Sequence, residues 1–307
     1  MNRRDFLKAA SAAFASATLS SSARAAGPQL AVTMDDFNVL DGVSLSAVER
    51  SARILAAFKQ HGAQAMGLVV GRNAATAQGN RVLDEWASAG HSIGNHTYSH
   101  PDYHATSTSA EAFARDFRRA DATLRTRRGF TPFFRFPMLR GGDTAEKRDS
   151  MRAVLAQFDY REAHVTIDNA DWLIDRALRD RLSADPKADA RPYRDLYLRH
   201  MLAYTRYFRE AAAEVFERDI PHTLLTHFNL LSALYLGDLL DALRGEGWSI
   251  IPAFEAYGDA VFRRAPQVLP AGDSLVVACA RESKRRLPRA PLEDERWLTT
   301  ELERLRR

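Results

Sequence analysis

Residues 30–36 read LAVTMDD, an apolar run that ends in two adjacent aspartates, Asp35 and Asp36. The same arrangement, a short apolar run followed at once by polar residues, recurs along the chain between stretches with helical spacing. Short strands that alternate with helices predict parallel strands joined by right-handed crossovers. We therefore expect an α/β fold, and six or seven such units in one run favour a barrel over an open sheet.

The apolar runs and helical patterns divide the chain into elements. Strands are expected at 30–33, 65–70, 91–94, 133–136, 163–167, 222–226 and 248–252. Helices are expected at 46–61, 81–89, 109–127, 144–158 and 232–244. Residues 173–219 interrupt the alternation with a longer, charged helical insertion. Because no internal Pro/Gly/Ser-rich linker is present, we expect one domain over 26–283, followed by a charged, solvated tail at 284–307 with a short terminal helix.

The first 25 residues have the features of an export signal. Arg3 and Arg4 precede a mildly apolar stretch, and Ala23-Arg24-Ala25 has the small-x-small pattern of a signal-peptidase site. The paired arginines followed by DFLK resemble a twin-arginine signal. An amphipathic helix of the domain is the alternative, but Ala and Ser crowd the segment without an apolar stripe. We expect a signal peptide over 1–25, the twin-arginine export machinery as a partner, and a periplasmic or secreted mature protein.

Charge and hydropathy exclude two classes of partner. The formal net charge is +4 at pH 7, and four basic residues against one acidic residue in the signal account for most of it. The mature protein is therefore nearly neutral, and we expect no nucleic-acid partner. No run reaches the 18 or so apolar residues that a membrane span needs, so no span is expected after signal cleavage. The single cysteine, Cys279, lies in an apolar run and is expected to be a buried small side chain.

Polar residues follow directly after five of the expected strands. These motifs are TMDD at 33–36, HTYSH at 96–100, RFPM at 135–138, DNADW at 168–172 and LLTH at 224–227. In α/β barrels the carboxyl ends of the strands form one face, where sites are built. The five motifs are therefore expected to converge in space.

The first two motifs have the composition of a hydrolytic metal site. Burying two adjacent carboxylates is unfavourable without a cation, and their side chains alternate along a strand, so one can bind a metal and the other act as a base. His96 and His100 lie on one face if their segment is a helical turn, and imidazole is a preferred zinc ligand. Two histidines and one carboxylate leave an open position for water. Taken alone, the Asp pair is better explained by an ordinary helix cap or turn, and histidines four residues apart are common on protein surfaces.

The later motifs supply an arginine and a further histidine. Arg135 lies at the end of an apolar strand among aromatic residues, where it is either a surface arginine stacked on a phenylalanine or a buried one with an anionic partner, for which Asp35 is the natural candidate. His227 ends an apolar strand and, taken alone, is better explained as a core histidine. A carboxylate such as Asp171 beside it would hold it protonated, as a general acid requires. The remaining histidines have no comparable neighbours, and we predict structural roles for residues 61, 91, 104, 164, 200 and 222.

The five motifs, in this order, resemble those of the NodB-homology polysaccharide deacetylases, carbohydrate esterase family 4. The resemblance covers roughly residues 29–260, leaves the insertion at 173–219 outside the usual pattern, and includes the block GHSIGNHTYSH. It implies a distorted (β/α) barrel, usually of seven strands. It also implies one divalent metal ion, commonly zinc, with cobalt or another divalent ion possible.

The resemblance assigns roles to the residues that match the first three motifs. Asp36, His96 and His100 correspond to the metal ligands. Asp35 corresponds to the base that accepts a proton from water. Arg135 corresponds to the residue that orients this base.

It also assigns roles on the side of the leaving group. The backbone N–H of Met138 corresponds to the donor for the oxyanion. His227 corresponds to the acid that protonates the leaving group, tuned by Asp171. Trp172 and Leu225 would line the pocket for the acetyl methyl group.

The chain also departs from the family pattern. Met34 stands where the family usually has Phe, Phe37-Asn38 where it has Gly-Pro, Met138 where Tyr is common, and Phe228 where Asp is frequent. None of these departures removes a reacting group. They bear on the substrate rather than on the reaction.

We therefore predict an enzyme, a metal-dependent hydrolase that removes acetyl groups from an acetylated carbohydrate. An N-acetylglucosamine-containing polymer or oligomer is preferred, although an exopolysaccharide and O-acetylated xylan fit the same motifs. One alternative is a C–N hydrolase of small cyclic amides on the same fold, which the export signal disfavours. Another is a non-catalytic carbohydrate-binding protein, which the presence of every reacting residue disfavours.

Overall fold

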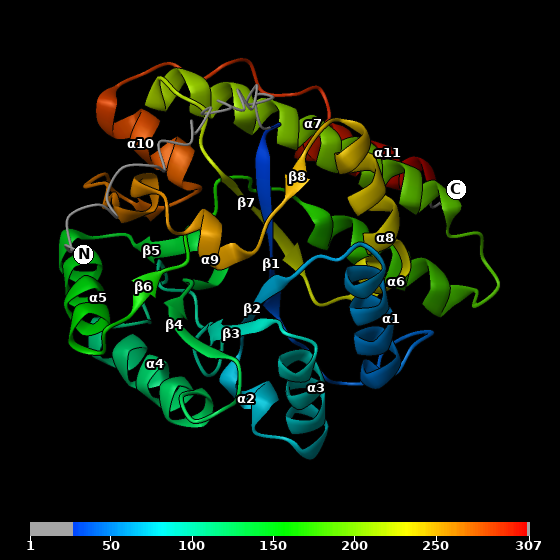
Figure 1. Cartoon of the computed structure of the whole chain (residues 1–307), viewed down its shortest axis with the longest axis horizontal. Coiled ribbons are helices and arrows are strands. Elements are labelled where there is room, and N and C mark those ends of the chain that lie inside the picture. Colours follow the sequence, from blue (N-terminus) through cyan, green and yellow to red (C-terminus); the bar gives the residue numbers. More distant parts are fainter. Residues whose placement is uncertain (1–26, 306–307) are drawn as a thin grey trace, which may run out of the picture.

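A curled parallel sheet forms the centre of the computed structural model, which describes residues 27–305 (Figure 1). Its order is β6-β4-β3-β2-β1-β7, with β8 paired to the start of β1. These strands are β1 (Gln29–Asp36), β2 (Ala65–Val69), β3 (Ser92–Asn95), β4 (Phe130–Phe134), β6 (Arg161–Glu162), β7 (His222–His227) and β8 (Ser249–Ile250). The predicted α/β fold is confirmed, as a half-barrel surrounded by helices. The expected signal peptide at 1–25 lies outside the described residues.

β1 occupies the middle of the sheet. Residues 30–35 are all buried, as expected for a parallel strand covered on both faces. Its register with β7 places Asp35 opposite His227, and its register with β2 places Asp36 opposite Val69. The two aspartates thus leave the sheet at its carboxyl edge, where the neighbouring strands also end.

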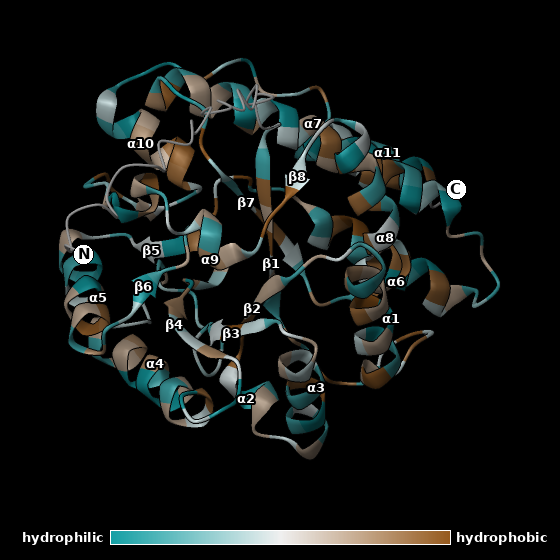
Figure 2. Ribbon diagram, in the orientation of Figure 1, coloured by the Kyte–Doolittle hydropathy of each residue, from teal (hydrophilic) through white to brown (hydrophobic). Residues whose placement is uncertain are grey.

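Helices surround the sheet (Figure 1). They are α1 (Ala47–Gln60), α2 (Gly71–Ala74), α3 (Ala77–Ser88), α4 (Ala110–Leu124), α5 (Ala145–Gln157), α6 (Asp171–Ala184), α7 (Arg191–Phe216), α8 (Leu230–Gly245), α9 (Ala253–Ala256), α10 (Leu275–Ser283) and α11 (Glu295–Leu305). Side chains of Ser46, Ser109 and Thr144 cap the helices that follow them, which explains why the predicted starts agree with the observed ones. Figure 2 shows apolar and polar residues alternating along these helices, as expected when one face is buried. None of the described helices has the length and apolar character needed to cross a membrane.

Two short features complete the fold near the site. The 3-10 turn η1 (Pro137–Leu139) leads into β5 (Arg140–Gly142), which pairs antiparallel with β9 (Ala271–Gly272). A second 3-10 turn, η2 (Ala260–Arg263), follows α9. A separate aromatic core lies between β4 and the helices α4 and α5, and it includes Tyr103, Phe113, Phe117, Phe134 and Phe136.

The predicted strand at 163–167 is wrong in its extent. Pairing is confined to β6, against β4, and to a single bridge between Ile167 and Leu224 of β7. Between these points the carbonyls of Ala163 and His164 accept hydrogen bonds from the side chains of Arg135 and Tyr257. Since side chains occupy these backbone acceptors, a continuous ladder does not form.

The insertion and the tail are both helical and packed. α6 and α7 account for most of residues 173–219, in agreement with the predicted helical insertion. The tail contains the expected terminal helix, α11, but this helix packs against α6 and α7 and buries Leu298 and Leu302. The tail is therefore not simply solvated. Cys279 is buried within α10, as predicted.

Candidate active site

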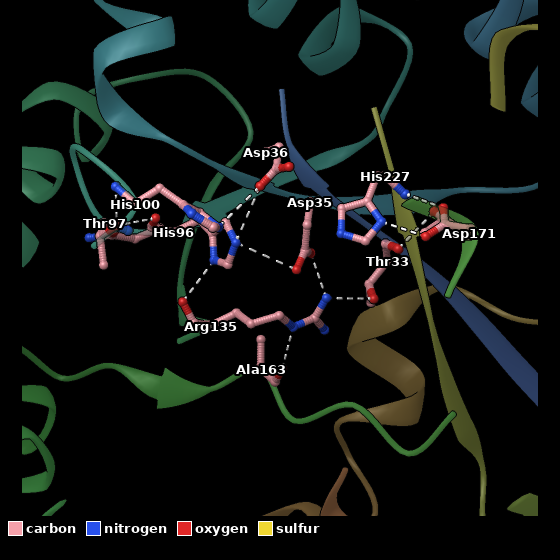
Figure 3. A network of polar contacts seen from close by, with 12 residues as sticks. Thr33, Asp35, Asp36, His96, Thr97, His100, Arg135, Ala163, Asp171 and His227 are labelled. Carbon is pink, nitrogen blue, oxygen red and sulfur yellow. Dashed lines mark hydrogen bonds and ion pairs between the residues drawn. The ribbon is translucent and has the colours of Figure 1, made fainter. Parts of the chain in front are cut away.

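A cavity of about 930 Å³ opens at the carboxyl edge of the sheet. Eight of the ten predicted site residues line it, namely Asp35, Asp36, His96, His100, Met138, Trp172, Leu225 and His227. The other two lie directly behind its wall, where Arg135 is 1% and Asp171 0% exposed. Figure 3 shows how the polar members converge from β1, the segments after β3 and β4, and β7. The structure thus brings together every residue that the sequence selected.

One carboxylate and two imidazoles form a group with metal-ligand geometry. Oδ1 of Asp36 lies 3.6 Å from Nε2 of His96 and 3.4 Å from Nε2 of His100. One potential ligand atom from each of the three residues lies within 4.8 Å of the others. Such a spacing can be bridged by one ion that each residue contacts at about 2 Å.

The hydrogen bond of His96 fixes the tautomer that a metal needs. Nδ1 of His96 lies 2.9 Å from the carbonyl oxygen of Arg135, which can only accept, so Nδ1 carries the proton. Nε2 therefore presents its lone pair to Asp36. Burial lowers the pKa of His96 to about 4, and that of His100 also to about 4, so both rings are neutral near pH 7.

The segment that carries these histidines is a loop rather than the helical turn considered from the sequence. Thr97 and His100 have positive φ values of 65° and 60°, which a helix excludes. Asp116 of α4 accepts hydrogen bonds from the backbone N–H groups of Tyr98 and Ser99, at 2.8 Å and 2.9 Å. The ring centroids of His96 and His100 still lie 4.9 Å apart, because the loop folds back on itself.

Asp35 is buried and held by Arg135. Nη1 of Arg135 donates to Oδ1 of Asp35 at 2.6 Å and to Oγ1 of Thr33 at 2.9 Å. The second oxygen of Asp35, Oδ2, lies 3.7 Å from Nε2 of His96 and thus faces the three potential metal ligands. Burial raises the pKa of Asp35, although Arg135 acts in the opposite direction. A carboxylate with one oxygen anchored and the other directed at the site has the geometry of a general base.

The backbone after Asp35 separates the two aspartates. Asp36 and Phe37 have φ values of 76° and 52°, in the left-handed region that non-glycine residues rarely adopt. The turn leaves the side chain of Asp36 40% exposed, whereas that of Asp35 is 4% exposed. Adjacent carboxylates therefore have different environments and are suited to different roles.

His227 is paired with a buried carboxylate on the opposite side of Asp35. Its Nδ1 lies 2.6 Å from Oδ1 of Asp171, and its backbone N–H donates to Oδ2 at 3.1 Å. Burial alone would lower the pKa of His227, but the charge and hydrogen bond of Asp171, together with the charges of Asp36 and Asp35, outweigh it and raise the pKa to about 10. The ring is therefore protonated near pH 7, and Nε2–H is its second donor.

The predicted pocket residues lie on the rim and floor of the cavity. Met138 belongs to η1, where it has a φ of 55°, and its side chain is half exposed. Trp172 is also half exposed, whereas Leu225 is 6% exposed. An exposed indole beside a buried leucine offers an apolar surface of the kind that carbohydrate rings and methyl groups contact.

Sequence reasoning missed Tyr257, which supports Arg135. Its hydroxyl donates to the carbonyl of His164 at 3.0 Å and accepts from Nη2 of Arg135 at 3.2 Å. The side chain is fully buried. Tyr257 follows the expected strand at 248–252, but no local pattern indicates its contact with Arg135, which lies more than a hundred residues earlier in the chain.

Two departures from the family pattern form one packed unit. The rings of Phe37 and Phe228 are stacked, with centroids 4.9 Å apart, and Phe37 also contacts Trp86 at 4.7 Å. A Cβ on Gly67 would lie 2.5 Å from the ring of Phe37, so only glycine leaves room for it. Phe37 and Phe228 therefore form one packed pair, and Phe228 also lines the cavity.

Comparisons with known proteins agree with this geometry. Residues 23–163 match the model of the polysaccharide deacetylase family. The chain is similar in structure to a peptidoglycan N-acetylglucosamine deacetylase, with 20% identity and a TM-score of 0.52 over 76% of this chain and 92% of that one. It is also similar to a family 4 pseudoenzyme from Bacillus anthracis, with 17% identity and a TM-score of 0.50 over 75% of this chain and 65% of that one. At these identities the structural likeness establishes the fold.

Proposed function

Since residues 23–163 identify the chain as a relative of the polysaccharide deacetylases, we propose that it is a metal-dependent enzyme that removes acetyl groups from an acetylated carbohydrate. The observation that carries the proposal is one cavity with three kinds of group. It contains the ligand group Asp36, His96 and His100, the anchored carboxylate Asp35, and the protonated His227.

The ligand group fits one divalent ion, with zinc preferred and cobalt or another divalent ion as alternatives. Two neutral imidazoles and one carboxylate are the donors of hydrolytic zinc sites, and they leave a coordination position open. The hydrogen bond from His96 to the Arg135 carbonyl is the supporting contact that such ligands usually have. A bound ion would supply Lewis acidity, by polarising the acetyl carbonyl and lowering the pKa of water.

Asp35 accepts the proton of the attacking water in the proposed reaction. Its Oδ2 faces the ligand group, while Arg135 holds Oδ1 and keeps the carboxylate from turning away. Thr33 and Tyr257 in turn hold the guanidinium of Arg135. Arg135 thus fixes the carboxylate of Asp35, and Thr33 and Tyr257 fix Arg135.

His227 donates a proton from Nε2 to the departing nitrogen or oxygen. Asp171 keeps the ring charged and oriented, since it binds both Nδ1 and the backbone N–H. The backbone N–H of Met138 is the proposed donor to the oxyanion that forms on the acetyl carbonyl. Trp172 and Leu225 are the proposed walls for the acetyl methyl group.

The proposed substrate contains N-acetylglucosamine. One structurally similar protein is named as a peptidoglycan N-acetylglucosamine deacetylase, which supports amide rather than ester substrates. The cavity, at about 930 Å³, is large enough for a sugar unit together with its neighbours in a chain, because pockets for drug-sized ligands measure about 300–1,000 Å³.

Acetate release from a panel of substrates tests the proposal. Mature protein, reconstituted with zinc or cobalt, is incubated with N-acetylglucosamine oligomers, peptidoglycan fragments and acetylated xylan, alongside the Asp35→Asn variant. We expect release that requires metal and disappears in the variant, which retains its metal. If Asp35→Asn kept the wild-type rate, the assignment of the base would be wrong.

If folded, metal-loaded protein released no acetate from any of these substrates, the deacetylase proposal would be contradicted. Hydrolysis of small cyclic amides would then favour the C–N hydrolase. Carbohydrate binding without turnover of either class would favour a binding protein, a relevant outcome because one similar structure is named a pseudoenzyme.

We also propose that the protein is exported through the twin-arginine pathway to the periplasm or beyond. The paired Arg3 and Arg4 and the site after Ala25 support this proposal. Replacement of both arginines by lysine should retain the full-length precursor in the cytoplasm. An unchanged extracytoplasmic fraction for this variant would contradict it.

A further inference from the structure

His200 lies in α7, within the insertion, and is completely buried. Its Nε2 is 2.9 Å from the backbone nitrogen of Ala170, and its Nδ1 is 2.9 Å from the carbonyl oxygen of Glu293. An N–H can only donate and a carbonyl can only accept, so Nε2 is the acceptor and Nδ1 carries the proton. Burial lowers the pKa of His200, in agreement with a neutral ring. The sequence had indicated only a structural histidine here.

The contact with Ala170 lies at the start of the helix that carries Asp171. Ala170 is the N-cap residue of α6, has a non-helical backbone (φ −115°, ψ 39°), and has no side chain that can cap. Helix starts leave backbone N–H groups without partners inside the helix. His200 supplies the missing acceptor at Ala170, and Oδ1 of Asn169 supplies one for the N–H of Asp171 at 3.0 Å.

The hydrogen bond to Glu293 connects His200 to the C-terminal tail. Arg199, the residue before His200, pairs with the Glu293 carboxylate at 3.0 Å and lies over the ring of Trp297, 4.5 Å from its centroid. Glu295, at the start of α11, lines the cavity. One buried ring thus joins the insertion, the loop before Asp171 and the tail that forms part of the cavity wall.

We propose that His200 is a positioning residue for the general acid. By holding the N–H of Ala170, it fixes the first turn of α6 so that the Asp171 carboxylate meets both Nδ1 and the backbone N–H of His227. Without this contact, Ala170 has no acceptor at a buried position, and the loop must move to find one. Asp171 would move with it and lose its short contact with His227. The catalytic consequence rests on the proposed function, whereas the positioning itself does not.

Two substitutions of His200 test the two hydrogen bonds of its ring one at a time. A glutamine amide reaches the position of Nε2 and can still accept from Ala170, whereas an asparagine amide reaches only the position of Nδ1 and keeps the donor to Glu293. We expect His200→Asn to lower the pKa of His227 by about one unit, as weakening one carboxylate contact does. His200→Gln should leave this pKa close to that of the wild type.

The readout is the titration of the His227 ring, followed by NMR in the full-length mature protein without substrate. A second readout is the alkaline limb of kcat/KM for acetate release, which should move to lower pH in His200→Asn by the same amount. His222→Asn is the matched control. His222 is also buried, with Nδ1 3.1 Å from Oγ1 of Thr166, and its loss should reduce stability without changing the titration of His227.

An unchanged His227 titration in His200→Asn would overturn the proposal and leave His200 as a packing residue. If His200→Asn does not fold, a lowered His227 pKa in His200→Gln overturns it equally, because that variant keeps the acceptor. A shifted titration in a protein that releases no acetate from any substrate would support the positioning role while rejecting the proposed function.

Discussion

His96 and His227 lie on opposite sides of Asp35 and differ in how strongly they hold a proton. Both rings are largely buried, and each donates from Nδ1 to an oxygen. For His96 this oxygen belongs to a neutral backbone carbonyl, and the pKa is lowered to about 4; for His227 it belongs to the Asp171 carboxylate, and the pKa is raised to about 10. The charge of the partner, rather than burial, therefore decides which histidine offers a lone pair and which offers a proton.

The groups on the two sides of Asp35 also come from different parts of the chain. The proposed ligand group and the proposed base come from β1 and the loop after β3, and Arg135 follows β4, all within the stretch that matches the family. The proposed acid, His227, and its partner Asp171 come from β7 and the start of α6, outside that stretch. Through His200, the insertion and the tail contact the loop before Asp171.

Removing one of the proposed metal ligands should have the largest effect on activity. His96→Ala removes one ligand and should abolish stoichiometric zinc binding. Because a metal ion contributes several kcal/mol to charge stabilisation in the transition state, acetate release should fall by more than about a thousandfold. Metal analysis and turnover check both. His104→Ala is the control, since that ring is hydrogen-bonded to the carbonyl of Ala271 and does not line the cavity. Equal losses in both variants would argue against the ligand assignment.

Removing the charge beside the proton-donating histidine should have the next largest effect. In Asp171→Asn burial is opposed only by the charges of Asp36 and Asp35, so the pKa of His227 should fall well below about 10. The ring then holds its proton less strongly, and kcat at neutral to alkaline pH should fall by about a hundredfold, as for other lost general acids. The descending limb of the pH profile should move to lower pH, because the protonated form is the active one. A limb that stayed at its wild-type position would show that another group is the acid.

Loosening the support of the base should reduce turnover less. Tyr257→Phe removes one of the two side-chain donors to the His164 carbonyl, leaving that of Thr223, and removes one acceptor from Arg135. We expect kcat to fall by about tenfold with little change in KM. Tyr103→Phe is the matched control, because its buried hydroxyl donates to the Lys147 carbonyl, away from Asp35. Both variants should lose about 1–3 kcal/mol of stability, measured by denaturant unfolding. Only Tyr257→Phe should lose activity.

The smallest expected effect concerns the two phenylalanines that depart from the family pattern. A double-mutant cycle with Phe37→Leu and Phe228→Leu should give a coupling of about 0.5–1.5 kcal/mol in unfolding free energy, typical of a stacked aromatic pair. Phe37→Leu and Phe113→Leu, which lie in separate cores, should be additive. Additivity within the first pair would mean that the two departures are independent.

Much of the fold was predictable because its signals are local. The N-caps at Ser46, Ser109 and Thr144, together with the apolar runs, are readable in a few residues each. The strand at 163–167 was not, since its carbonyls are occupied by side chains of Arg135 and Tyr257 that arrive from distant parts of the chain.

The site residues were predictable for a similar reason, and their supports were not. Ordered motifs at strand ends identified the groups at the cavity. The loop form of HTYSH depends on Asp116 of another helix, and the contact of His200 depends on Ala170 and Glu293, none of which is near in sequence. Such contacts exist only after the elements have packed.

The pairing of β1 with β7 also sets an order for folding. β1, β2 and β3 follow one another in sequence and can pair after short loops close, whereas the rung that joins Asp35 to His227 requires most of the described chain to be brought back. Contacts of such long separation form slowly. We therefore expect the nascent chain to acquire the ability to capture an ion before it acquires the ability to hydrolyse a substrate.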